Sequence, residues 1–81
     1  RGIAHLVRGL AYSELGQESD AALDINRASA FSDAEITSFK KLFNDFPGSF
    51  PNTKAMLAKE NAPWNNLLSQ DSAKKLLNLL Q

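Results

Sequence analysis

Apolar residues recur at steps of three and four along most of this chain, the spacing of one face of an α-helix. A first helix is predicted over residues 2–15, and Gly16 is placed to end it because glycine tolerates the left-handed conformation of helix ends. A second helix is predicted over residues 18–30. Its apolar face holds Ala21, Ala22, Ile25 and Ala28. Neither segment shows the alternation of a strand, so the pattern favours an all-α fold.

The next segment opens on a capping box, in which Ser32 and Glu35 satisfy the first N–H groups of a helix. This third helix is predicted from Asp33 to about Phe46, where Pro47 and Gly48 end it. Its apolar stripe consists of Ile36, Phe39, Leu42, Phe43 and Phe46. We expect Phe39, Leu42 and Phe46 to be buried together.

The last third of the chain predicts shorter helices. Phe50-Pro51-Asn52 opens a fourth one, since proline is tolerated in a first turn, and it breaks before Pro63. Residues 64–68 form one further turn. Ser69 is a suitable cap for a final helix over residues 70–81, with Asp71 favourable near its positive end.

One short pattern occurs twice. Residues 38–44 read Ser-Phe-Lys-Lys-Leu-Phe-Asn and residues 72–78 read Ser-Ala-Lys-Lys-Leu-Leu-Asn, so that Lys74 follows Lys40 by 34 residues. A period near 34 is typical of stacked helix-pair repeats, which bury their apolar faces against neighbouring units. This spacing indicates a binding scaffold more than a catalyst.

The chain resembles a tetratricopeptide repeat protein. In a first unit over residues 2–33, the residues at the positions of that motif are Gly9, Tyr12, Gly16, Ala21, Ile25 and Ala28. In a second unit over residues 36–62 they are Phe39, Leu42, Phe46, Ala55 and Ala62. A third unit, residues 70–81, offers only a first helix. His5, Arg8 and Phe43 depart from the motif.

The resemblance implies one domain of antiparallel helix hairpins, stacked as a short right-handed solenoid. It implies that Tyr12, Ala21, Ile25 and Ala28 are buried together. A small irregular helical bundle is the alternative architecture.

Composition narrows the function. The 81 residues suffice for one small domain, and we expect it to be a piece of a longer chain because it opens at Arg1 in a helical segment. The charges of its 9 basic and 9 acidic residues cancel. A neutral chain has no net positive field to attract polyanions, so we expect no nucleic-acid partner and no membrane partner. The absence of cysteine favours a reducing compartment such as the cytoplasm.

Residues with catalytic chemistry are sparse. His5 is the single histidine, and there is no cysteine, no nucleophile-elbow motif and no glycine-rich phosphate loop. Asp24 and Arg27 are three residues apart and are expected to pair weakly on the solvent side. The sequence therefore predicts no enzyme activity, no metal site and no cofactor.

The repeated Lys-Lys-x-x-Asn pattern is the candidate binding site. The resemblance implies that these residues face a concave groove, as in members of the family that clamp the terminal carboxylate of a peptide. The residues concerned are Lys40, Lys41, Asn44, Lys74, Lys75 and Asn78. The alternative is that they form an ordinary solvated helix face.

The corresponding positions of the first unit are apolar: Leu6, Val7 and Leu10. A groove with one apolar and one basic half fits a peptide or helix that has apolar anchors and an acidic or carboxylate end. We therefore predict a protein–protein interaction scaffold. The alternative is a structural domain without a peptide ligand, which forms a homodimer through residues 76–80.

Overall fold

The computed structural model describes residues 2–28, 33–43 and 49–81. All regular secondary structure in these ranges is helical, which confirms the predicted all-α class. The elements are α1 (Gly2–Glu14), α2 (Glu18–Ala28), α3 (Asp33–Phe43), α4 (Pro51–Leu57), the 3-10 helix η1 (Pro63–Asn66) and α5 (Gln70–Leu80).

Helices α1 and α2 form a tight antiparallel hairpin. Gly16 has a positive φ of 82°, and the N–H groups of Gly16 and Gln17 donate to the carbonyls of Ser13 and Tyr12. This pair of bonds is the Schellman arrangement, which satisfies the last carbonyls of α1. At Gly9 the helices approach so closely that a β-carbon would lie 2.9 Å from Ile25 Cγ1.

Helix α4 is capped by a residue from another helix. Phe50 precedes it in the left-handed conformation and has no polar side chain to offer. The Glu14 carboxylate at the end of α1 accepts from the backbone N–H of Thr53 at 2.7 Å and from that of Asn52 at 3.3 Å. A carboxylate at a helix N-terminus also compensates the helix dipole. Glu14 thereby ties α4 to the end of α1.

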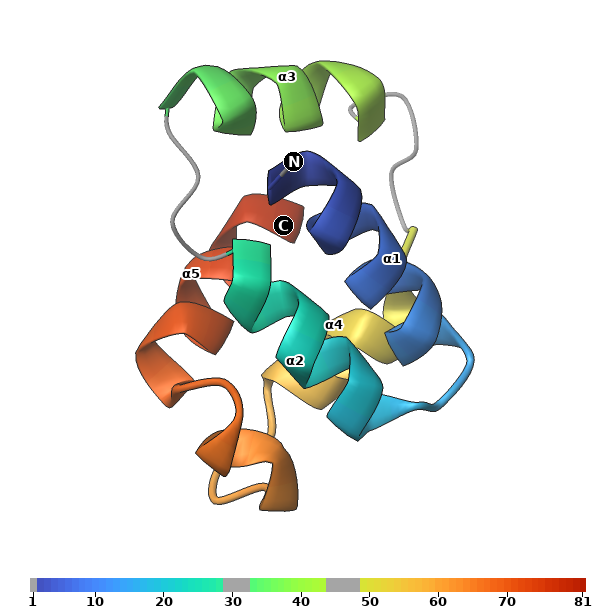
Figure 1. The fold of residues 1–81 in the computed structure, drawn as a ribbon, viewed down its shortest axis with the longest axis vertical. Helices are drawn as coiled ribbons and strands as arrows, with labels where there is room; N and C mark the ends of the chain where they lie inside the picture. The colour runs from blue at the N-terminus through green and yellow to red at the C-terminus, as the bar shows by residue number, and fades with distance from the viewer. Residues whose placement is uncertain (1, 29–32, 44–48) are drawn as a thin grey trace.

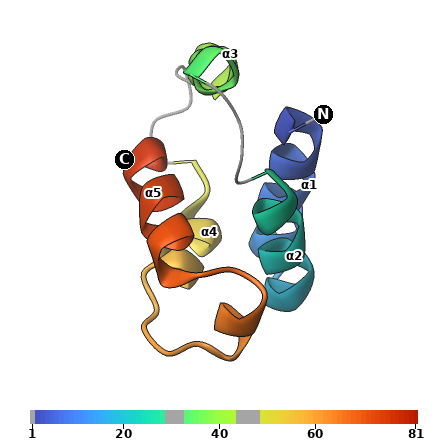
Figure 2. The same ribbon diagram turned by 60° about the vertical axis from the view of Figure 1, so that its left-hand side comes forward.

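The helices form a sandwich with both ends closed. Figure 2 shows α1 and α2 on one side and α4 and α5 on the other. Helix α3 lies across one end of this sandwich, and η1 lies at the opposite end (Figures 1 and 2). Helix α4 contacts both α1 and α5.

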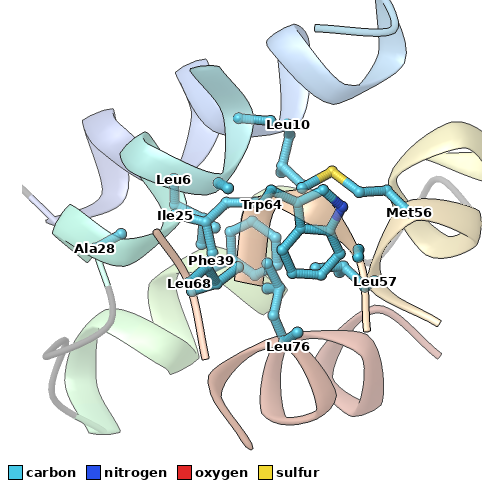
Figure 3. Packing of buried hydrophobic residues seen from close by; sticks show 14 residues of the cluster. Leu6, Leu10, Ile25, Ala28, Phe39, Met56, Leu57, Trp64, Leu68 and Leu76 are labelled. Atoms are coloured by element: carbon cyan, nitrogen blue, oxygen red, sulfur yellow. The ribbon is translucent and has the colours of Figure 1, made fainter. Parts of the chain in front are cut away.

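Each end of the sandwich contributes one aromatic ring to the core. Phe39 of α3 and Trp64 of η1 are both 2 % exposed. Figure 3 shows the two rings in the middle of the buried cluster. The other large members of that cluster are Leu6, Leu10, Ile25, Met56, Leu57, Leu68 and Leu76.

The structure corrects part of the predicted core. Ala21, Ile25 and Ala28 are buried as expected, whereas Tyr12 is only partly buried against the cluster. Leu42 was expected beside Phe39 but is 58 % exposed, because the described part of α3 turns a single residue into the core. Phe46 and Ser32, and the side chains of Ile36 and Phe43, lie outside what the structure describes.

Helices α1 and α2 form an antiparallel hairpin over the residues where the tetratricopeptide resemblance predicts a first unit. The stacking of further hairpins into a solenoid is not confirmed. Helix α3 crosses the end of the sandwich in both views, instead of running alongside α1 or α5 (Figures 1 and 2). A second hairpin of α3 with α4 is therefore not evident.

Candidate functional site

The predicted lysine rows are on the surface. Lys40 and Lys41 of α3 are exposed, as are Lys74, Lys75 and Asn78 of α5. Asn44 lies outside the described residues. The exposure of these residues agrees both with a peptide-binding surface and with an ordinary solvated helix face.

The surroundings of Lys74 come from α4 and α5. Together with Lys59 and Glu60, it lines a hollow of about 150 Å³ between the end of α4 and the start of α5. No residue of α3 lines this hollow. A single groove that joins Lys40 to Lys74 stays a prediction.

The predicted binding site has to be corrected at Leu6 and Leu10, which were expected to line a groove. Each is 1 % exposed and belongs to the core cluster (Figure 3). They face the interior because the helix side that carries them also carries Gly9, where α2 makes its closest approach. Neither residue is available to a peptide, so the prediction that they line a groove is wrong.

A cluster of charged side chains centres on Asp24 of α2, whose own side chain is 1 % exposed. Arg8 of α1 binds it with two hydrogen bonds, from Nε to Oδ2 at 2.6 Å and from Nη2 to Oδ1 at 2.8 Å. Arg27 donates from Nη1 to Oδ1 at 2.9 Å. His5 Nδ1 lies 3.7 Å from the same oxygen.

These contacts keep Asp24 ionised. The hydrogen bond from Arg8, helped by that from Arg27, outweighs burial and lowers the pKa of Asp24 from 3.8 to about 2. The same hydrogen bond raises the pKa of Arg8. Because both carboxylate oxygens are engaged by guanidinium groups, Asp24 is poorly placed to take a proton from a substrate. Its role here is to hold the arginines.

The arginines themselves reach solvent. The side chains of Arg8 and Arg27 are 53 % and 45 % exposed. The guanidinium of Arg8 also lies 6.0 Å from the centre of the Tyr12 ring, within the range of a cation–π contact. A buried carboxylate thus fixes two exposed cations on the outer surface of the α1–α2 hairpin.

Sequence reasoning missed this cluster by placing Asp24 on the solvent side. A signal was present: Asp24 follows Ala21 by three residues and precedes Ala28 by four, so it lies within the apolar stripe of α2. A charged residue at a core position requires a partner, because an unpaired buried charge is very costly. Arg8, which departs from the tetratricopeptide motif, is that partner.

The solvent-facing side of α1 is also unusual, because it is largely apolar. The exposed residues at three- and four-residue steps are Ala4, Val7 and Ala11 of α1 and Leu15, which directly follows its end; we call these four residues the α1 stripe. Val7 is 40 % exposed and Leu15 is 72 % exposed. Contiguous apolar surface that stays exposed marks a candidate interaction site.

Other classes of site find little support in the part of the chain that the structure describes. No group of three or more histidine, cysteine or acidic residues is arranged to hold a metal ion there. None of the described helices is long and apolar enough to cross a membrane. A hydroxyl cluster of Ser13 and Thr53 is buried, and Thr53 donates to Glu14, so this cluster serves the cap of α4.

No protein-family model matches the chain, and no match was found among curated proteins or among solved structures. The tetratricopeptide resemblance therefore stays a prediction. Function has to be argued from the geometry of the α1 stripe and of the Asp24 cluster.

The Asp24 cluster predicts an acid-sensitive contribution to stability. A carboxylate whose pKa is lowered on folding stabilises the folded state above its unfolded pKa, and this stabilisation is lost as the pH falls through the folded value. We expect the free energy of unfolding, measured with urea, to fall from about pH 4 towards about pH 2 for this reason. The free energy of unfolding of the variant Asp24→Asn should fall less steeply over that pH window. Equal slopes would assign the acid sensitivity to other carboxylates.

Proposed function

We propose that this chain is a protein-interaction module that docks a helix of a partner protein along the α1 stripe. The observation that carries the proposal is that Ala4, Val7 and Ala11 of α1, together with Leu15 directly after it, are exposed on the side away from buried Leu6 and Leu10. Water contact with such a stripe is unfavourable, and covering it releases about 25 cal/mol for each Å² of apolar surface.

The spacing of the stripe favours a helix as the occupant. Residues at steps of three and four form a straight ridge along a helix, and a second helix packs its own ridge beside it. The small side chains of Ala4 and Ala11 alternate with the larger Val7 and Leu15 along this ridge, so a partner helix can approach closely at the two alanines.

The tetratricopeptide resemblance is compatible with this proposal. In a solenoid of such units, helix hairpins bury their faces against neighbouring hairpins, and a ligand helix occupies a face that remains. We propose the scaffold role as the function. The short solenoid stays a prediction from the resemblance, and the position of α3 across the end of the sandwich (Figures 1 and 2) does not support it. Of the predicted lysine rows, Lys74 is the residue that lines a hollow, so a second groove for an acidic peptide would lie there.

The alternative, a structural domain that forms a dimer through residues 76–80, has less support. Leu77, Leu79 and Leu80 are partly buried and pack against the core cluster. These contacts reduce the apolar surface that the end of α5 can offer to a second copy. By contrast, the four residues of the α1 stripe are exposed in the part of the chain that the structure describes.

The proposal is tested with a synthetic amphipathic helical peptide that has leucine along one face and glutamate beside it. We expect the chain to bind this peptide and Val7→Glu to weaken binding at least about tenfold, because a buried Val contributes roughly 1.5 kcal/mol or more and an introduced charge must be desolvated.

The matched control is Leu42→Glu, which places the same charge on α3, where Leu42 is 58 % exposed. It should bind like the unchanged chain, and circular dichroism should show equal helix content in all three proteins. Equal affinity for Val7→Glu, or no binding by the unchanged chain, would contradict the proposal.

A further inference from the structure

We infer that Arg8 and Arg27 form a carboxylate-binding pair at the edge of the α1 stripe, so that the partner is an acidic amphipathic helix. This inference rests on the proposed function, because it concerns the partner of the same surface. Asp24 is the positioning residue of the pair, and it acts through the arginines without touching the partner.

The two arginines are held side by side. Nη2 of Arg8 and Nη1 of Arg27 both donate to the same oxygen of Asp24, at 2.8 and 2.9 Å. Arg8 uses its Nε and Nη2 atoms for this contact. A guanidinium has five N–H donors, so both groups keep further donors for a second carboxylate. The exposed fractions of the two side chains show that water, and hence a ligand, reaches them.

The local charge is positive although the chain as a whole is neutral. Two permanently charged guanidinium groups face one carboxylate, which leaves one positive charge uncompensated. Asp20 is exposed one turn earlier on α2, and within the described part of the chain it forms no ion pair with either arginine. His5 lies beside the same carboxylate, with Nδ1 3.7 Å from Oδ1 of Asp24.

The pair borders the α1 stripe. Arg8 follows Ala4 by four residues and precedes Ala11 by three, so these three residues neighbour one another on one side of α1. Arg27 reaches the same place from α2 through Asp24. A helix that lies along the α1 stripe therefore has one flank beside the arginines, and an acidic residue on that flank meets them.

The restraint by Asp24 matters for binding. An arginine that is already oriented loses less side-chain entropy when a ligand carboxylate arrives. Guanidinium groups also match carboxylates with two parallel hydrogen bonds. Because the site is half open to water, the gain is modest and depends on salt. The pair is therefore expected to select between partners more than to supply most of the affinity.

The experiment compares two synthetic helical peptides with the same leucine face, one with glutamate on the flank and one with glutamine in its place. We expect the unchanged chain to bind the glutamate peptide about fivefold more tightly at low salt, the upper range for exposed ion pairs, with the preference shrinking in high salt. Arg8→Gln and Arg27→Gln should each reduce this preference, which is measured as the ratio of the affinities for the two peptides so that a general loss of stability cancels.

Asp24→Asn releases the arginines and also removes the negative charge that compensates one of them. Positioning by Asp24 predicts a smaller preference in spite of the added positive charge, whereas a larger preference would show that charge alone selects the acidic peptide and that Asp24 is not a positioning residue. A loss of folding would lower the binding of both peptides, so the ratio of the two affinities separates positioning from stability. Lys75→Gln, which removes one exposed charge from α5, is the matched control and should keep the preference.

The outcomes distinguish this inference from the proposed function. If the unchanged chain binds both peptides equally, the arginine pair does not select acidic partners and the inference is overturned, while docking on the α1 stripe stands. If it binds neither peptide, the proposed function itself is overturned. An undiminished preference in both Arg8→Gln and Arg27→Gln would assign the selectivity to other charges, the lysine rows first.

Discussion

Replacing Trp64 with alanine is expected to remove most of the stability of this domain. The ring is 2 % exposed and lies in the middle of the core cluster (Figure 3). Truncating a buried aromatic ring to alanine costs about 3–5 kcal/mol, and small domains have only about 5–15 kcal/mol of stability in total. At 81 residues the chain is near the lower end of that range. Urea unfolding followed by circular dichroism measures the loss.

Trp64→Phe is the matched control, and it tests the role of the indole nitrogen. Nε1 of Trp64 is buried without a hydrogen-bond partner in the part of the chain that the structure describes. Phenylalanine keeps an aromatic ring in place and removes this unpaired donor, whose burial itself costs about 1–3 kcal/mol. We therefore expect Trp64→Phe to be far more stable than Trp64→Ala. A phenylalanine variant as unstable as the alanine variant would show that the full size of the indole ring is essential.

Local signals predicted the elements well. Gly16 ends α1 at a positive φ, and Ser69 caps α5 by accepting from the N–H of Ser72 at 3.2 Å. Pro51 stands in the first turn of α4, and Pro63 begins the short turn expected before α5. Such features depend on a few neighbouring residues, so a sequence pattern is sufficient to find them.

Contacts between distant residues were harder to predict. Glu14 caps a helix that starts 37 residues later, and no local motif marks that role. Asp24 was recognisable as a charged residue at an apolar position, but its principal partner Arg8 comes from another helix. Both carboxylates are bound by groups that only the folded chain brings near. The sequence also placed Leu6 and Leu10 in the candidate binding groove, although both belong to the core of the folded chain.

The position of α3 likewise depends on contacts with distant residues, which the sequence pattern did not predict. Its apolar stripe predicted a helix with a broad buried face, yet Phe39 is buried while Leu42, three residues later, is exposed. A hydrophobic period defines a helix face but not the number of neighbours that will cover it. The 34-residue spacing predicted a third helix alongside the first, whereas α3 crosses the end of the sandwich (Figures 1 and 2).

Replacing Phe39 with alanine is expected to release α3 while the rest of the domain stays folded. Among the described side chains of α3, that of Phe39 is the buried one, and α1 is the neighbour with which α3 shares most contacts. Without the ring, α3 loses its main attachment. An isolated helix of 11 residues is marginal in water, so the released segment should also lose much of its helicity.

Hydrogen exchange measures this release one segment at a time. We expect amide protection in α3 to be largely lost in Phe39→Ala, and that in α1, α2 and α5 to decrease less, because local openings require less free energy than global unfolding. The matched control is Leu42→Ala, which truncates an exposed residue of the same helix and should change stability by no more than about 0.5 kcal/mol. Uniform loss of protection in Phe39→Ala would instead show that α3 is an integral part of the cooperative core, since a ring that anchors only α3 cannot unfold the α1–α2 hairpin with it.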